Sequence, residues 1–171
     1  KVLTRNQLRI FILELIARIR KLIEKQGYWR TLYRRASGKE NERAPLRETS
    51  INLMLGMLME RDCQEAGIDL NLAPGVANGE PDFKFSVGPI KGLIEVKRLT
   101  HPKLISDAVA QVARYAEADV FDPLVLLVVN NGGDPQRLKK LKARVERLSA
   151  PRIEVEYING SIRLVPSKEP G

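Results

Sequence analysis

The sequence has few of the residues that stabilise secreted, membrane-spanning or zinc-bound proteins. Its 171 residues include one cysteine, Cys63, and one histidine, His101. A single cysteine excludes an internal disulfide and a cysteine-rich zinc site, and it fits a reducing, cytoplasmic compartment. No apolar run approaches the roughly 20 residues of a membrane span, which excludes membrane insertion. No signal peptide is visible, and the chain opens on Lys1, which leaves open upstream domains of a longer protein.

The positive charge is concentrated near the N-terminus. Residues 1–47 carry 13 Lys/Arg against 4 Asp/Glu, whereas residues 48–171 carry 16 against 17. A basic region beside a near-neutral body attracts polyanions, of which nucleic acid is the commonest. A solvated basic helix or a subunit contact, as in a homodimer, explains the same charge. The length and the ordinary share of hydrophobic residues fit one compact domain.

A long amphipathic helix is predicted at the N-terminus. Thr4 and Gln7 form a capping-box pattern, and apolar residues at helical spacing follow as far as Gly27. The polar face of this helix is basic. We therefore predict a basic helical extension over residues 1–44 and a core over residues 45–171.

The segment 28–35 interleaves aromatic and basic residues. Aromatic rings can stack on bases while guanidinium groups bind phosphates. The candidate nucleic-acid contacts are Arg30, Arg34 and Arg35. The alternative is that the aromatic rings only pin the helix onto its neighbour. Residues 37–45 are polar and aperiodic, which indicates an exposed linker.

The remaining pattern predicts an α/β fold with a central mixed β-sheet flanked by helices. Helices are expected over 46–66, 102–119 and 135–148, and strands over 68–72, 82–87, 90–99 and 123–129. A final hairpin is expected from strands 153–157 and 161–165, turning at Asn159-Gly160. The strand 123–129 is apolar enough to lie inside the sheet. Together with the strand 90–99 and the helix between them, it should form a right-handed βαβ unit.

Three ionisable residues should meet on the hairpin that turns at Gly88-Pro89. Glu95 and Lys97 are two residues apart in one strand, so their side chains share a face. A symmetric hairpin places Asp82 opposite Glu95. Two converging carboxylates repel unless a cation lies between them, and Mg²⁺ prefers such oxygen ligands. The alternative is an exposed Glu–Lys ion pair with an unrelated aspartate in a turn.

This arrangement resembles the PD-(D/E)XK nuclease superfamily through Pro81-Asp82 and Glu95-Val96-Lys97. The resemblance implies a restriction-endonuclease-like fold and hydrolysis of phosphodiester bonds, with DNA as the favoured substrate and endonuclease action favoured. It implies a Mg²⁺ cofactor, or Mn²⁺, held by Asp82, Glu95 and the backbone carbonyl of Val96. It also implies that Lys97 orients or activates the attacking water.

Two further features extend the resemblance. Members commonly carry a glutamate on the preceding helix, and Glu48 matches best, with Glu60 as the alternative. The pattern Gln111-x-x-x-Tyr115 resembles that of the RecB-type branch, and its amide and phenol could contact the DNA backbone or steady Lys97. Four-residue spacing places both side chains on one helix face. The histidine that precedes the motif in that branch has no clear counterpart here.

The resemblance covers roughly residues 46–131 and leaves two rival functions open. A nucleic-acid-binding or assembly module could keep this fold without catalysis and act through its basic helix. A nuclease of the same type could act on RNA. Metal dependence separates the first rival, and side-by-side cleavage of DNA and RNA separates the second.

Overall fold

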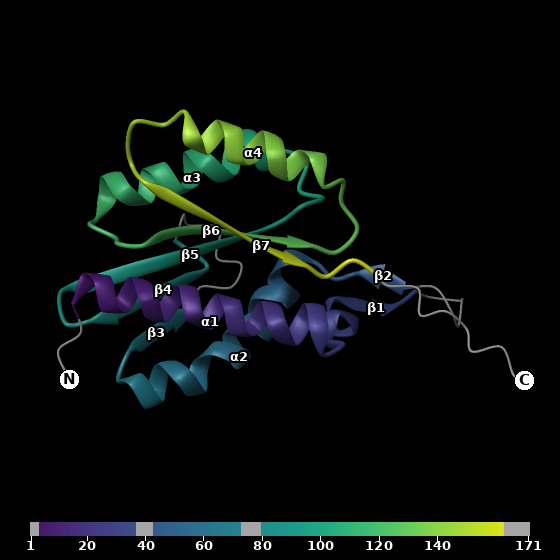
Figure 1. The fold of residues 1–171 in the computed structure, drawn as a ribbon, viewed down its shortest axis with the longest axis horizontal. Helices are drawn as coiled ribbons and strands as arrows, with labels where there is room; N and C mark the ends of the chain where they lie inside the picture. Colours follow the sequence, from purple (N-terminus) through teal and green to yellow (C-terminus); the bar gives the residue numbers. More distant parts are fainter. Residues whose placement is uncertain (1–3, 37–42, 73–79, 163–171) are drawn as a thin grey trace, which may run out of the picture.

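The computed structural model describes residues 4–36, 43–72 and 80–162. These residues form a five-stranded mixed sheet with helices on both faces, together with a separate two-stranded sheet (Figure 1). The predicted α/β class and flanked mixed sheet are therefore confirmed. The elements are α1 (Arg5–Lys25), the 3-10 helix η1 (Tyr28–Leu32), β1 (Tyr33–Arg35), β2 (Arg43–Pro45), α2 (Glu48–Ala66), β3 (Asp69–Leu72), β4 (Phe83–Val87), β5 (Ile90–Arg98), α3 (Leu104–Ala118), β6 (Leu124–Asn130), α4 (Gln136–Glu146) and β7 (Ile153–Asn159).

The large sheet has the strand order β3-β4-β5-β6-β7, and its pairing changes from antiparallel to parallel at β5. Strands β3, β4 and β5 pair antiparallel, whereas β5, β6 and β7 pair parallel. In the β4–β5 hairpin Phe83 pairs with Ile94 and Val87 pairs with Ile90, which is the predicted symmetric register. All of β6 is buried, as its apolar sequence predicts.

Two hydrophobic layers enclose this sheet. In Figure 1, α1 and α2 lie on one face and α3 and α4 on the other. Ile94 and Val96 of β5 join the layer under α1 and α2, whereas Leu93 and Leu99 join the layer under α3 and α4. Because side chains alternate along a strand, Glu95 must point to the α3 side of the sheet, as must Lys97.

Helix α1, predicted to belong to a basic helical extension over residues 1–44, packs in the same hydrophobic layer as α2 and the sheet. The capping box is present: Gln7 N–H donates to Thr4 Oγ1, and Thr4 N–H donates to Gln7 Oε1. The apolar stripe of α1 is buried in the same layer as α2 and the sheet. Ile12, for example, is fully buried, and its Cδ1 lies 2.8 Å from where a Cβ on Gly92 of β5 would stand. The N-terminal helix and the sheet therefore pack as one unit.

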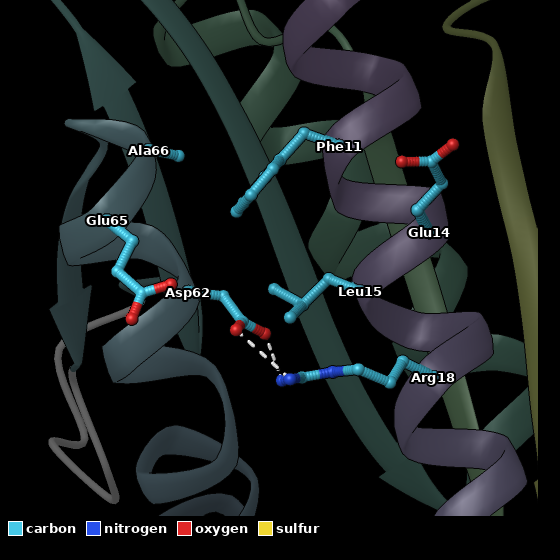
Figure 2. A pocket seen from close by; sticks show the side chains of 7 residues that line it. All are labelled: Phe11, Glu14, Leu15, Arg18, Asp62, Glu65 and Ala66. Carbon is cyan, nitrogen blue, oxygen red and sulfur yellow. Dashed lines mark hydrogen bonds and ion pairs between the residues drawn. The ribbon is translucent and has the colours of Figure 1, made fainter.

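Three of the six basic side chains of α1 pair with acids elsewhere in the fold. Arg9 pairs with Glu154 and Arg20 pairs with Glu156, both on β7. The third of these arginines, Arg18, points from α1 to α2 and pairs with an aspartate, as Figure 2 shows. Arg9 and Arg20 thus tie α1 to the sheet and Arg18 ties it to α2, which is the structural alternative to nucleic-acid binding.

The predicted C-terminal hairpin is wrong in its described part. Strand β7 runs through Asn159, which pairs with Asn130 of the parallel strand β6. Gly160 N–H then donates to the Asn130 carbonyl at 2.8 Å. A Cβ on Gly160 would lie 2.0 Å from Leu32 Cδ1, so this glycine serves close packing rather than a turn. Residues 163–165 of the expected second strand lie outside the described residues.

Two predicted loops lie only partly within the described residues. Arg43–Pro45, expected in the linker, forms strand β2 and pairs with β1, while residues 37–42 lie outside the described residues. The turn-rich loop expected before Asp82 also falls largely outside them, over residues 73–79. None of the described helices is both long and apolar enough to cross a membrane.

Candidate active site

Strand β5 extends beyond the end of its partner β4, and two carboxylates take the place of that partner. Pairing between the strands ends at Phe83 and Ile94. The next N–H groups on this edge belong to Val96 and Arg98. Val96 N–H donates to Asp82 Oδ2 at 2.8 Å, and Arg98 N–H donates to Glu48 Oε2 at 3.2 Å. The free strand edge therefore fixes both acids.

The ammonium of Lys97 joins the carboxylates into one group, and we name Glu48, Asp82, Glu95 and Lys97 together the acidic cluster. Lys97 Nζ lies 2.7 Å from Glu95 Oε1 and 3.2 Å from Glu48 Oε1. The side chains of Lys97 and Glu95 are only 8% and 1% exposed. Burial alone would lower the pKa of Lys97, but the charges of Glu95 and Glu48 raise it above its usual range. Lys97 is therefore a buried cation that is protonated near neutral pH.

The carboxylates of the cluster outnumber its single ammonium. Burial raises the pKa of Asp82 to about 7, and the charge of Glu95 adds to this rise. Burial also raises the pKa of Glu95, although Lys97 partly opposes that shift. Negative charge held away from water in this way attracts a further cation or proton.

Asn52 contacts the acidic cluster, and the sequence analysis missed it. It lies one turn after Glu48 on α2, and its Nδ2 donates to Asp82 Oδ1 at 2.6 Å. Its side chain is 3% exposed, so this bond forms in the interior. The available signal was an amide four residues after Glu48, which places both side chains on the same face of the helix.

Helix α3 supports the cluster from the other side. Tyr115 OH accepts from Gln111 Nε2 at 2.7 Å and donates to the Glu80 carbonyl at 2.9 Å. The predicted shared face of Gln111 and Tyr115 is thus confirmed. Burial raises the pKa of Tyr115 to about 12, and the nearby charge of Glu95 adds to it. Tyr115 is only 6% exposed, so its hydroxyl steadies the segment before Asp82 instead of forming an open contact surface.

The three predicted arginine contacts lie apart from the cluster. Arg30, Arg34 and Arg35 are exposed on η1 and β1, and none forms an ion pair with an acid of the cluster among the described residues. The Arg30 guanidinium lies 4.9 Å from the centroid of the Trp29 ring, which is itself buried. Trp29 therefore anchors this segment, as the packing alternative requires.

The small sheet nevertheless connects to the site through Leu46. Leu46 N–H donates to the Leu32 carbonyl. The Leu46 carbonyl accepts from Arg98 Nη1 and from Asn131 Nδ2. These bonds fix the start of α2, and with it Glu48, at the carboxyl ends of β5 and β6. Glu60, the alternative to Glu48, is exposed on α2.

The cluster has oxygen atoms suited to a divalent metal, although Lys97 bridges two of its carboxylates, those of Glu48 and Glu95. No three Asp, Glu, His or Cys side chains in the described part of the chain converge as a ready metal cage. Glu95 Oε2, however, is buried without a hydrogen-bond partner. The Val96 carbonyl faces the same strand edge as its N–H. Carboxylate and carbonyl oxygens with excess negative charge fit a hard cation such as Mg²⁺.

A hollow between α1 and α2 contains no comparable chemistry. It has a volume of about 420 Å³ and lies between α1 and α2, with Phe11 and Leu15 on one wall (Figure 2). Arg18 spans it, donating to Asp62 Oδ1 at 3.0 Å and to the Leu58 carbonyl at 2.9 Å. Its central charges therefore satisfy each other, and the acidic cluster is the better candidate site.

Comparison with known proteins gives a family without an assigned activity. No curated protein and no solved structure matches the chain. One family model, described as "Domain of unknown function (DUF8371)", matches residues 8–133. The match extends from α1 to the end of β6 and includes every residue of the acidic cluster. Because it spans well over half of the sequence, the chain belongs to this family.

Proposed function

We propose that the protein is a metal-dependent nuclease of the PD-(D/E)XK type that hydrolyses phosphodiester bonds, with DNA as the favoured substrate. One observation carries the proposal: Asp82, Glu95 and Lys97 meet at the edge where β5 extends beyond β4. Glu48 joins them from the helix that precedes the motif. The order of α2, the β4–β5 hairpin, α3 and the parallel strand β6 supports a restriction-endonuclease-like core.

The residues have separable roles in this proposal. Asp82, Glu95, Glu48 and the Val96 carbonyl would hold Mg²⁺, which when bound polarises the scissile phosphate and lowers the pKa of water. Asn52 fixes the orientation of the Asp82 carboxylate. The raised pKa of Lys97 makes it a poor proton acceptor near neutral pH. Its role is instead to stabilise negative charge developing on the phosphate.

Cleavage assays with a matched pair of aspartate variants test the proposal. Closed-circular DNA, linear DNA and RNA are incubated with the protein in Mg²⁺, in Mn²⁺ or in EDTA. We expect metal-dependent cutting of DNA, and cutting of closed circles identifies endonuclease action. Asp82→Asn should lower the rate at least about 100-fold, because it removes a metal ligand. Asp69→Asn, an exposed control on β3, should cut normally.

The same assay can reject the proposal. Failure of the wild-type protein to cut any of the three substrates in either metal would contradict it. Cutting of RNA alone would keep the chemistry and change the substrate. Equal rates for Asp82→Asn and Asp69→Asn would remove Asp82 from the mechanism.

A non-catalytic nucleic-acid-binding module is the second candidate, and the position of Lys97 favours it. Lys97 bridges Glu95 and Glu48, so these acids have a counter-charge without a metal. In such a module the cluster serves stability alone. The melting temperature of the protein would then be the same with and without Mg²⁺, whereas Mg²⁺ bound at a nuclease site would raise it.

A further inference from the structure

Helix α4 carries positive charge that the rest of the described fold does not neutralise. Between Gln136 and Glu146 it has five basic residues and one acidic residue. None of the five forms an ion pair with an acid among the described residues, whereas Arg9, Arg18 and Arg20 of α1 all do. Among the described residues, α4 therefore has five basic side chains without an acidic partner, whereas α1 has three, Arg5, Lys21 and Lys25.

Helix α4 is held firmly against the end of the motif strand. Leu141 is fully buried in the layer shared with α3. At the start of α4, the Arg137 guanidinium donates to the carbonyls of Leu99, His101 and Pro102. Leu99 lies two residues beyond Lys97 in the chain. The start of α4 is thus fixed next to the strand that carries the acidic cluster.

A basic groove separates α4 from the start of α3. This hollow, of about 390 Å³, is lined by Lys103 and Ser106 on the α3 side and by Arg137 and Arg144 on α4. Lys140 is three residues after Arg137 and four before Arg144, so it lies on the same flank of the helix. We name the surface formed by Lys103, Arg137, Lys140 and Arg144 the α3–α4 groove. No acidic side chain lines the hollow.

We propose that the α3–α4 groove binds the sugar–phosphate backbone of the nucleic acid that the acidic cluster cuts. The inference rests on the proposed function and names the surface that holds its substrate. Arginine and lysine side chains recognise phosphate oxygens without reading sequence. Their alignment along one helix flank, beginning at the end of β5, places a bound backbone next to the motif strand. An acidic protein segment is the competing occupant, and the test below distinguishes it.

Salt-dependent DNA binding tests the groove without requiring cleavage. Affinity for a fluorescent duplex is measured by anisotropy in EDTA at several salt concentrations, for the wild type, Lys140→Ala, Arg144→Ala and the double variant. Each lost phosphate contact should lower the slope of log affinity against log salt by about 1. Lys142→Ala is the matched control, because Lys142 lies beside Val145 and Val155 in a different hollow. It should leave the slope unchanged.

The outcomes separate this inference from the proposed function. An unchanged slope in the double variant overturns the groove, as does an equal loss in Lys142→Ala. Displacement of the duplex by polyglutamate at equal charge concentration also overturns it, because the groove then prefers acidic chains in general. Groove-dependent binding by a protein that never cuts DNA supports the groove and rejects the nuclease. Circular dichroism of each variant confirms that the fold is intact.

Discussion

Lys97 lies between Glu95 and Glu48, and this position limits the chemistry open to it. A lysine that acts as a general base needs a lowered pKa, which burial in apolar surroundings can provide. Here the two carboxylates outweigh burial and raise the pKa of Lys97. The side chain therefore acts as a fixed positive charge, and any proton from an attacking water must go elsewhere.

The partly buried carboxyl of Asp82 should make metal-free stability depend on pH. Its pKa in the folded protein is raised from 3.8 to about 7, mainly by burial. A raised pKa means that its contribution to stability is complete at low pH and is lost as the pH rises toward 7. We expect Asp82→Asn to raise the free energy of unfolding at pH 8 in EDTA by about 1 to 3 kcal/mol.

Urea unfolding at pH 4.5 and pH 8 measures this effect, because one pH lies below the raised pKa and the other above it. The difference between Asp82→Asn and the wild type should be larger at pH 8. Asp69→Asn, at an exposed position, should show no such pH-dependent gain. A wild-type protein that is more stable than Asp82→Asn at pH 8 would contradict the assigned burial of this charge.

Asn52 should act as a positioning residue for Asp82. Its Nδ2 is the only side-chain donor bound to Asp82 in the described part of the chain. In Asn52→Ala the carboxylate loses this constraint, so we expect kcat to fall roughly 10- to 100-fold with little change in DNA affinity. Steady-state kinetics separate the two parameters. Asn71→Ala, an exposed control on β3, should behave as wild type, and a loss confined to affinity would refute the role of Asn52.

Helix α1 supports the motif strand through its buried face. Ile12 is fully buried and packs against β5 at Gly92, whereas Ile10 on the same helix is 46% exposed. We expect Ile12→Ala to lower the free energy of unfolding by about 2 to 5 kcal/mol and Ile10→Ala by less than about 0.5 kcal/mol. Chemical denaturation measures both. Equal small effects would mean that the packing of α1 on β5 adds little to stability.

The β4–β5 hairpin shows what the sequence was sufficient to predict. A turn at Gly88-Pro89 and alternating side chains determine which residues face each other, and the pairs from Val87 with Ile90 to Phe83 with Ile94 follow the predicted register. Asp82 lies one residue beyond the last pair, where its carboxylate accepts from Val96 N–H instead of pairing with Glu95 in the sheet. The resemblance then added Glu48, which the structure brings to Lys97.

Features that depend on distant residues were not predictable in this way. The acids that neutralise Arg9 and Arg18, namely Glu154 and Asp62, lie far away in the sequence. Local charge therefore suggested a binding surface on α1 where the fold has ion pairs. The dipeptide Asn159-Gly160 is typical of a hairpin turn, but pairing with β6 and close packing on Leu32 keep the chain extended.

Across the whole molecule, a bound metal should appear as added stability. The cluster exists only in the folded chain, so an ion that binds it stabilises the folded state by mass action. We expect the melting temperature at pH 8 to rise with Mg²⁺ for the wild type and not for Glu95→Gln, which removes a buried ligand. Differential scanning fluorimetry with and without EDTA measures the shift. An equal rise in both proteins would indicate that Mg²⁺ binds elsewhere.

In the whole molecule, the surface proposed to bind the substrate and the cluster proposed to cut it are formed by different residues. Its buried cluster lies at the end of β5, and the basic side chains of α4, which have no acidic partner in the described part of the chain, lie beside that end. Changes to the cluster should therefore alter the cleavage rate, and changes to the α3–α4 groove should alter affinity.

Single-turnover cleavage by Lys97→Met tests the central claim most directly. Lys91→Met is the matched control, because Lys91 lies on the same strand but pairs with Asp119 away from the cluster. With saturating protein and Mg²⁺, Lys97→Met should cut DNA at least about 100-fold more slowly than the wild type while binding it equally well. Lys91→Met should cut at the wild-type rate. A wild-type cleavage rate for Lys97→Met would contradict the proposed active site.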